Sequence, residues 1–318
     1  MDEHLRVIAE ADGVFLRREA LSCGYDDKTI ARRVRAGTWH RVRHGAYCFG
    51  DVWSTATPEE QHLLLARAVL RSTPGPVALS HTTALLAHGV AVWGADLARV
   101  HVTRLDRGAA RLEPDVVHHV AHASAAEVEV VDGSPVFGVG RSVIEAATVL
   151  GLESALVSAD SALHARLTDP GELRSVFATM THRPGAQKIH VVLHHMDGRA
   201  ETPGESRSNF LFWRQGLPRP QLQHAVLDES GALVAETDFA WHEFKTFGEF
   251  DGRQKYGRLL RPGEEPGDAV FREKVREDRV RELTGYRFVR WVWSDLARPG
   301  ETAERIRRVL RQGARGAS

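Results

Sequence analysis

Four carboxylates in the last third of the chain have the spacing of a shared metal site: Glu236, Asp238, Glu249 and Asp251. They lie in the segment ETDFAWHEFKTFGEFDG, whose pattern predicts a hairpin of strands 232–241 and 246–251. Pairing across this hairpin places Asp238 opposite Glu249 and Glu236 opposite Asp251, with all four side chains on one face. Directly opposed side chains have Cβ atoms about 5 Å apart, where like charges are destabilising. A positive group is therefore expected between them.

Clustered carboxylate oxygens are ligands that Mg²⁺ and Mn²⁺ prefer, so we predict one of these two ions at this site. Such an ion polarises a phosphate and lowers the pKa of a bound water, which makes hydroxide available near neutral pH. Glu249 and Asp251 project together because they are two residues apart, whereas Phe250 points to the opposite face and into the core. The alternative interpretation is that these acids are solvated residues of an ordinary hairpin.

Residues 200–315 resemble the PD-(D/E)XK nuclease superfamily through the motifs GESRSNFLFWRQGLP, TDFAW, GEFDG and REDRVRELTGYRFVRW. The resemblance is to the branch of very-short-patch repair endonucleases. It implies hydrolysis of a DNA phosphodiester, with Asp238 and Glu249 as metal ligands. It also implies that Glu205, on the preceding helix, is a third ligand.

One position departs from that family pattern. The signature lysine, two residues after the second acid, is Asp251 here, and an aspartate cannot act as a cation. Asp251 is expected to bind the ion or to help activate water, and Gln254 or Lys255 are candidates for the missing polar or positive group. A degenerate nuclease fold that binds no metal is the alternative.

The first fifty residues have the order of a winged helix-turn-helix, which is three helices followed by a hairpin. Periodicity and glycine stops predict helices in 2–11, 15–24 and 25–37, and the hairpin turns at His44-Gly45. The third helix and the hairpin carry the candidate DNA-binding residues Lys28, Thr29, Arg32, Arg33, Arg41 and Arg43. Helix residues are expected to meet base edges, and hairpin residues are expected to meet phosphates. The alternatives are a solvated helix face or a surface that contacts protein.

The segment GVFLRREALSCGYDDKTIARRVRAGTWHRVRHGAY resembles the amino-terminal domain of AbiEi-type antitoxins of type IV toxin–antitoxin systems. ALSHTTALLAHGV resembles the start of the antitoxin domain that follows. The resemblance implies that the winged helix binds the protein's own promoter. It also implies that the middle domain engages a cognate toxin or another protein.

Histidine is frequent, with 17 residues in the chain. His118 and His119 point to opposite faces of a predicted strand, so they cannot easily share one ion. His122 and the pair His194-His195 lack a matching set of Cys or Glu ligands. His81 and His88 follow Ser80, a predicted helix cap, and lie two helical turns apart. We interpret all of these histidines as structural.

The 318 residues are enough for three domains, predicted as a winged helix in 1–52, an AbiEi-like α/β domain in 53–199 and a nuclease-like domain in 200–318. The predicted fold class is mixed α/β, with a helix-rich middle and a final mixed sheet flanked by helices. AETPGES, near 200–206, is a candidate linker or loop. Lys+Arg and Asp+Glu both total 42, so net charge neither favours nor excludes a polyanionic partner.

The two cysteines exclude a disulfide framework, and the chain has neither a signal-like nor a membrane-spanning apolar run. We therefore expect a cytoplasmic protein with DNA and no membrane as its partner. The expected function is DNA binding with metal-dependent endonuclease activity, in phage defence or DNA repair. The alternative is a non-enzymatic type IV antitoxin or transcriptional regulator whose nuclease-like domain is inactive.

Overall fold

The computed structural model describes residues 2–106, 109–120, 125–180, 185–252 and 266–315. The chain divides into two compact units, Met1–His195 and Met196–Ser318. AETPGES is part of the second unit, because Thr202 caps helix α11 (Pro203–Arg214) by accepting a hydrogen bond from the Glu205 amide. The expectation of a linker or loop therefore holds for residues 200–202 only, since 203–206 are helical. Its Pro and Gly belong to the first turn of a helix, where proline is well tolerated.

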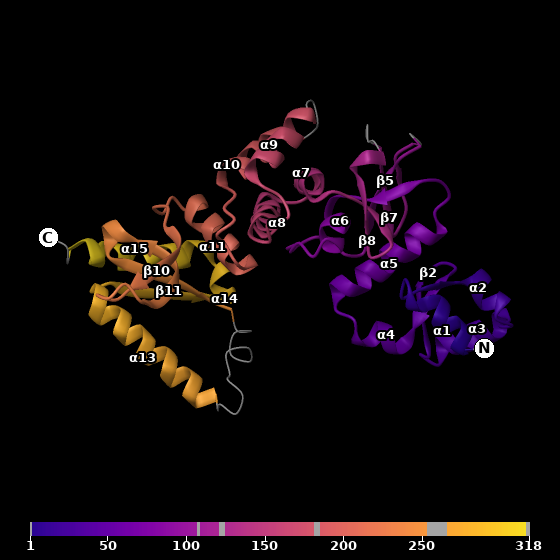
Figure 1. The fold of residues 1–318 in the computed structure, drawn as a ribbon, viewed down its shortest axis with the longest axis horizontal. Helices are drawn as coiled ribbons and strands as arrows, with labels where there is room; N and C mark the ends of the chain where they lie inside the picture. Colours follow the sequence, from indigo (N-terminus) through magenta and orange to yellow (C-terminus); the bar gives the residue numbers. More distant parts are fainter. Residues whose placement is uncertain (1, 107–108, 121–124, 181–184, 253–265, 316–318) are drawn as a thin grey trace. The chain divides into compact units, whose positions relative to one another are not determined.

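Unit 1 begins with a winged helix-turn-helix (Figure 1). Its elements are α1 (Asp2–Glu10), β1 (Phe15–Leu16), α2 (Arg17–Ser22), α3 (Asp27–Arg35), β2 (Trp39–Arg43) and β3 (Ala46–Phe49). The three strands form an antiparallel sheet in the order β1-β3-β2. Aromatic rings fill the core, with Phe15 and Trp39 at a centroid distance of 4.8 Å. The predicted order of helices and hairpin is confirmed.

The rest of unit 1 contains a six-stranded sheet in the order β6-β7-β5-β4-β9-β8. The strands are β4 (Val77–Leu79), β5 (Val100–Arg104), β6 (Arg111–Leu112), β7 (Val116–Val120), β8 (Val128–Val131) and β9 (Ser134–Phe137). The helices are α4 (Gly50–Thr55), α5 (Pro58–Ser72), α6 (His81–Ala87), α7 (Val139–Val149), α8 (Leu152–His164), α9 (Pro170–Thr179) and α10 (Ala186–His195). Strands β4, β8 and β9 have only three or four residues each, so they carry little periodicity that the sequence alone could show.

Helix α5 connects the winged helix to this sheet. One side of the helix packs on sheet residues such as Val102 and Val136, and Leu64 and Ala68 pack on the winged helix. Arg71 strengthens the second contact, because its guanidinium donates to the Val14 carbonyl at 2.6 Å and pairs with Glu19. The winged helix is therefore held firmly within unit 1.

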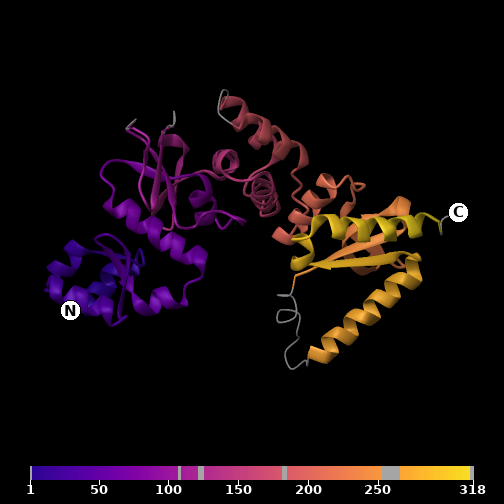
Figure 2. The same cartoon turned by 180° about the vertical axis from the view of Figure 1, so that it is seen from behind.

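Unit 2 is a four-stranded mixed sheet in the order β10-β11-β12-β13 with helices on both faces (Figures 1 and 2). After α11 come β10 (Gln221–Leu227), β11 (Leu233–Trp241), β12 (Thr246–Asp251), α13 (Pro266–Thr284), β13 (Arg287–Val292), α14 (Trp293–Leu296) and α15 (Pro299–Arg315). The first three strands are antiparallel, and β13 is parallel to β12. Helices α11 and α15 pack on the face with Phe239 and Trp291, and α13 packs on the face with Phe247. The predicted mixed α/β fold is confirmed.

None of the described helices is both long and apolar enough to cross a membrane.

Candidate DNA-binding surface and acidic site

The exposed face of α3 is cationic. Ile30 and Val34 turn inward to the core of the winged helix. Lys28, Arg32 and Arg35, spaced as i, i+4 and i+7 on one face, are exposed. We call these three residues the α3 cationic stripe. Its start is fixed, because the Asp26 carboxylate accepts a hydrogen bond from the Thr29 amide at 2.7 Å.

The hairpin of β2 and β3 adds further polar groups. Arg41 and His44 are exposed, and Gly45 at the turn has φ +74°, a backbone conformation that favours glycine. Arg33 on α3 is half-buried and has partners within the fold.

The position of Arg43 does not fit the expectation that this residue contacts a DNA phosphate. Its side chain is only 14% exposed and lies 3.3 Å from Glu113 and 3.0 Å from Asp115. The sequence separation of about 70 residues hides these two carboxylates from any local pattern. Because Arg43 already has two anionic partners, we assign it a structural role. It joins the β2–β3 hairpin to the six-stranded sheet, because both carboxylates lie between β6 and β7.

The acidic hairpin has the predicted register over the part where it is paired. Trp241 lies opposite Thr246 and Phe239 opposite Gly248, but the ladder ends there, one step before Asp238 and Glu249. Beyond that point the Asp238 carboxylate accepts a hydrogen bond from the Phe250 amide at 2.8 Å. Phe250 itself is buried in the core, as predicted.

Asp238 faces Gln223 of β10 across the sheet, because Leu222 pairs with Phe239 and His224 pairs with Thr237. Gln223 has φ +48°, and its side-chain amide donates to the Glu205 carboxylate at 2.7 Å. We call Glu205, Gln223 and Asp238 the acidic fork. It lies where β11 and β12 cease to pair, at the first turn of α11.

Glu249, predicted as a metal ligand, has two cationic neighbours. Arg276 of α13 donates to it at 2.9 Å, and Arg290 of β13 donates at 2.7 Å. The positive charge expected near this carboxylate is thus provided by guanidinium groups. Among the described residues, the set of three potential ligands with atoms within 4.8 Å of one another is formed by histidines rather than by Glu205, Asp238 and Glu249.

The remaining predicted residues lie around this region. Glu236 is exposed and pairs with Ala225 of β10, and Asp251 is half-buried opposite Val292 of β13. These two acids are therefore not a ladder pair of the described hairpin. Gln254 and Lys255 fall outside the described residues.

Glu205 is the most strongly perturbed group of the acidic fork. Its carboxylate is 2% exposed and accepts hydrogen bonds from the Thr202 hydroxyl at 2.9 Å and the Glu201 amide at 3.0 Å. Burial, followed by the charge of Asp238, raises the pKa of Glu205 to about 7. A buried carboxyl group whose pKa lies near neutrality is typical of a site that transfers protons or binds a cation.

The raised pKa predicts a pH effect on stability. The folded chain binds the Glu205 proton more tightly than the unfolded chain, whose pKa is near 4.5, so stability is lost as pH rises from about 4.5 to about 7. Replacing Glu205 with Gln should remove a loss on the order of 3 kcal/mol between these limits. Urea unfolding at pH 5 and pH 8 measures it. Glu229→Gln, at an exposed turn of the same unit, is the matched control, and an equal pH dependence in all three proteins would contradict the prediction.

Three histidines meet in unit 1, although no pattern in the sequence predicts that they do. His81 begins α6, His101 lies on β5 and His119 lies on β7, and their ring nitrogens lie within 4.8 Å of one another. His118 turns to the other side of β7 and approaches Glu113 at 3.2 Å, so the expectation that His118 and His119 do not share an ion agrees with their positions. His122 lies outside the described residues. The three histidines come from three separate elements, so local spacing carries no signal of them.

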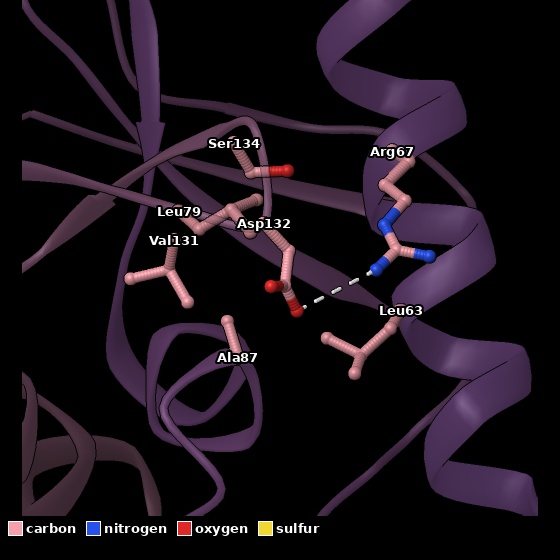
Figure 3. A pocket seen from close by; sticks show the side chains of 7 residues that line it. All are labelled: Leu63, Arg67, Leu79, Ala87, Val131, Asp132 and Ser134. Carbon is pink, nitrogen blue, oxygen red and sulfur yellow. Dashed lines mark ion pairs between the residues drawn. The ribbon is translucent and has the colours of Figure 1, made fainter. Parts of the chain in front are cut away.

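A small hollow between α5, β4 and the β8–β9 turn has little room for chemistry (Figure 3). Its volume is about 20 Å³, which suits about one water molecule. Apolar side chains line most of it, and Arg67 and Asp132 lie 4.0 Å apart at its edge. This hollow is not a substrate site.

The amino-terminal segment matches a known protein family. Residues 5–50 match the family model described as "Transcriptional regulator, AbiEi antitoxin". The amino-terminal domain is therefore of the AbiEi antitoxin type. This type implies DNA binding, and the match does not extend to the residues with the nuclease resemblance.

The chain is also similar to two uncharacterised proteins, MT2308 and Rv2248, from two strains of Mycobacterium tuberculosis. Each is 29% identical over 280 residues, which covers 87% of this chain and 94% of the relative. Among solved structures, the crystal structure of the RV2827C protein from Mycobacterium tuberculosis matches with a TM-score of 0.38 and 15% identity, over 68% of this chain and 83% of that one. We draw no conclusion about fold or function from this similarity. The family match of residues 5–50 is the comparison that bears on function.

Proposed function

We propose that this protein is a DNA-binding transcriptional regulator that represses its own promoter. The observation that supports this best is the α3 cationic stripe, which is exposed on the third helix of an AbiEi-type winged helix. In such a module the third helix enters the major groove, where Arg and Lys donate to guanine O6 and N7. Arg41 and His44 on the hairpin would contact phosphates and fix the orientation.

The attachment of the winged helix within unit 1 supports this proposal. Arg43 and Arg71 bind carboxylates and a carbonyl of the same unit, so they stiffen the base of the module rather than its DNA-facing side. A stiff base reduces the ordering cost of binding. A cognate toxin or other protein is a candidate partner of residues 53–199 under the same proposal.

A mobility-shift titration tests the regulator. Full-length protein is mixed with a duplex from upstream of its own gene and with a shuffled duplex of equal length, at several salt concentrations. We expect tighter binding to the upstream duplex, with log affinity falling linearly with log salt. Equal, weak binding to both duplexes would contradict the proposal.

A metal-dependent endonuclease in unit 2 is the second candidate. The order of one helix, three antiparallel strands, a helix and a parallel strand favours it, as does the adjacency of Glu205 and Asp238 in the acidic fork. Those two carboxylates would hold Mg²⁺ or Mn²⁺, and the ion would supply an activated water for attack on a phosphodiester. Glu249 and Asp251 would complete the site after Glu249 exchanges its arginine partners for the ion and the DNA.

DNA cleavage tests the second candidate. Plasmid and linear DNA are incubated with the full chain in Mg²⁺, Mn²⁺ or EDTA. We expect metal-dependent strand breaks that Asp238→Asn and Glu249→Ala reduce by at least about 100-fold. Asparagine can still accept the hydrogen bond from the Phe250 amide, and Glu229→Gln, at an exposed turn, is the control. If the DNA stays intact under every condition, the endonuclease proposal is wrong and the transcriptional regulator is the remaining candidate.

A further inference from the structure

The three histidines that meet in unit 1 lie on the face of the six-stranded sheet away from α5. Val100, Val102 and Val116 point from β5 and β7 into the core that α5 covers. His101 and His119 alternate with these valines and therefore project from the opposite face. His81, at the start of α6, completes the set, which we call the histidine cluster.

The three rings of this cluster lie in direct contact. His101 Nδ1 and His119 Nε2 are 2.8 Å apart, and the ring of His81 stacks on that of His119 with centroids 3.7 Å apart. Two imidazole nitrogens at this distance either share a proton or direct two lone pairs at a common cation. Histidines on a solvated surface do not usually cluster in this way. His81 is buried, with only 4% of its surface exposed.

One ring nitrogen of His81 has two polar neighbours. Its Nδ1 lies 3.0 Å from the Ser80 hydroxyl and 3.6 Å from the Glu145 carboxylate. The negative charge of a carboxylate at 3.6 Å favours a proton on the facing nitrogen, which raises the basicity of the other nitrogen. One ring nitrogen of His81 lies within 4.8 Å of ring nitrogens of His101 and His119, close enough for the three to share one ion after small side-chain movements.

Two further observations point to a bound group. His81 has φ +52°, an uncommon conformation for a side chain other than glycine, and such strained residues cluster at ligand sites. Thr103 lies opposite His119 in the ladder and two residues from His101, on the same face. Its hydroxyl is buried and has no hydrogen-bond partner among the described residues, so it suits a water molecule held at the site.

We propose that His81, His101 and His119 bind one divalent transition-metal ion of the Zn²⁺ class. Three neutral imidazoles suit Zn²⁺, Co²⁺ or Ni²⁺ better than Mg²⁺, which prefers oxygen ligands. Nitrogen ligands lie about 2.0–2.1 Å from Zn²⁺, which places two ligand nitrogens of a tetrahedral site about 3.3 Å apart, so binding replaces the 2.8 Å contact between His101 and His119 by two bonds to the ion. The fourth position takes water, for which the Thr103 hydroxyl is a partner.

This site is separate in chemistry from the acidic fork, since it offers nitrogen atoms in unit 1 and the fork offers oxygen atoms in unit 2.

Metal titration of the full-length chain tests the proposal. Chelator-treated protein is titrated with Zn²⁺ by calorimetry and with Co²⁺ by visible absorption. We expect one ion per chain, and the intense bands of four- or five-coordinate Co²⁺. His101→Gln and His119→Gln should each lose most of the binding, and Glu145→Gln should weaken it by about 10–100-fold.

Two controls separate this site from other ligands. Asp238→Asn alters the acidic fork and His194→Gln removes an exposed histidine of α10, and both should retain the stoichiometry of the wild type. Wild-type protein that binds neither ion, or gives the weak bands of six-coordinate Co²⁺, overturns the proposal even if a histidine variant fails to fold. A folded His101→Gln, His119→Gln double variant with wild-type affinity for Zn²⁺ overturns it as well.

Discussion

Replacing Lys28, Arg32, Arg35 and Arg41 together with alanine is expected to weaken binding to the upstream duplex by at least about 100-fold near 0.1 M salt. All four side chains are exposed on α3 and the hairpin, so the substitutions leave the core of the winged helix intact. Each lost phosphate contact should also reduce the slope of log affinity against log salt by about 0.9. A mobility shift over a salt series measures both quantities.

A matched variant removes the same charge elsewhere in unit 1. Arg99, Arg111, Arg166 and Arg174 are also exposed, and their joint replacement by alanine should change affinity only slightly. If both variants lose equal affinity, net charge rather than the α3 cationic stripe controls binding. If neither loses affinity, the winged helix does not contact DNA.

The substitution Glu145→Ala is expected to destabilise unit 1 by about 3–5 kcal/mol, because it leaves the buried guanidinium of Arg141 without its buried partner. Glu145 is 0% exposed and lies 2.9 Å from Nε of Arg141, which is itself 7% exposed. Arg141 also binds Glu127 at 2.6 Å, but that carboxylate is 45% exposed and remains hydrated. Glu127→Ala should therefore cost only about 0–1 kcal/mol.

The two variants remove the same charge from the same arginine and differ in the burial of the partner. Thermal unfolding, combined with hydrogen exchange of α5 peptides, measures the change in unit 1. Peptides of β12, in unit 2, provide an internal reference. Equal losses in the two variants would show that burial does not determine the contribution of this pair.

Local sequence determined much of this fold. Asp26 as a cap, Ile30 and Val34 as an apolar stripe and Gly45 at the turn specify the winged helix through interactions within a few residues. The register of the β11–β12 hairpin also followed from its short loop, which is why Trp241 lies opposite Thr246 as predicted. Periodicity, caps and turns are local, so one sequence contains enough information to predict them.

The partners of the charged and polar side chains were decided by tertiary structure alone. Glu249 has Arg276 and Arg290 as neighbours, 27 and 41 residues away, and Arg43 has Glu113, 70 residues away. The histidine cluster joins the start of α6 to two strands in the same way. Which long-range groups meet depends on how separate elements pack, and local spacing does not encode that packing. The sequence by itself therefore determined the elements and the surface of the winged helix, whereas the tertiary structure decided which carboxylates are already neutralised and which histidines can share an ion.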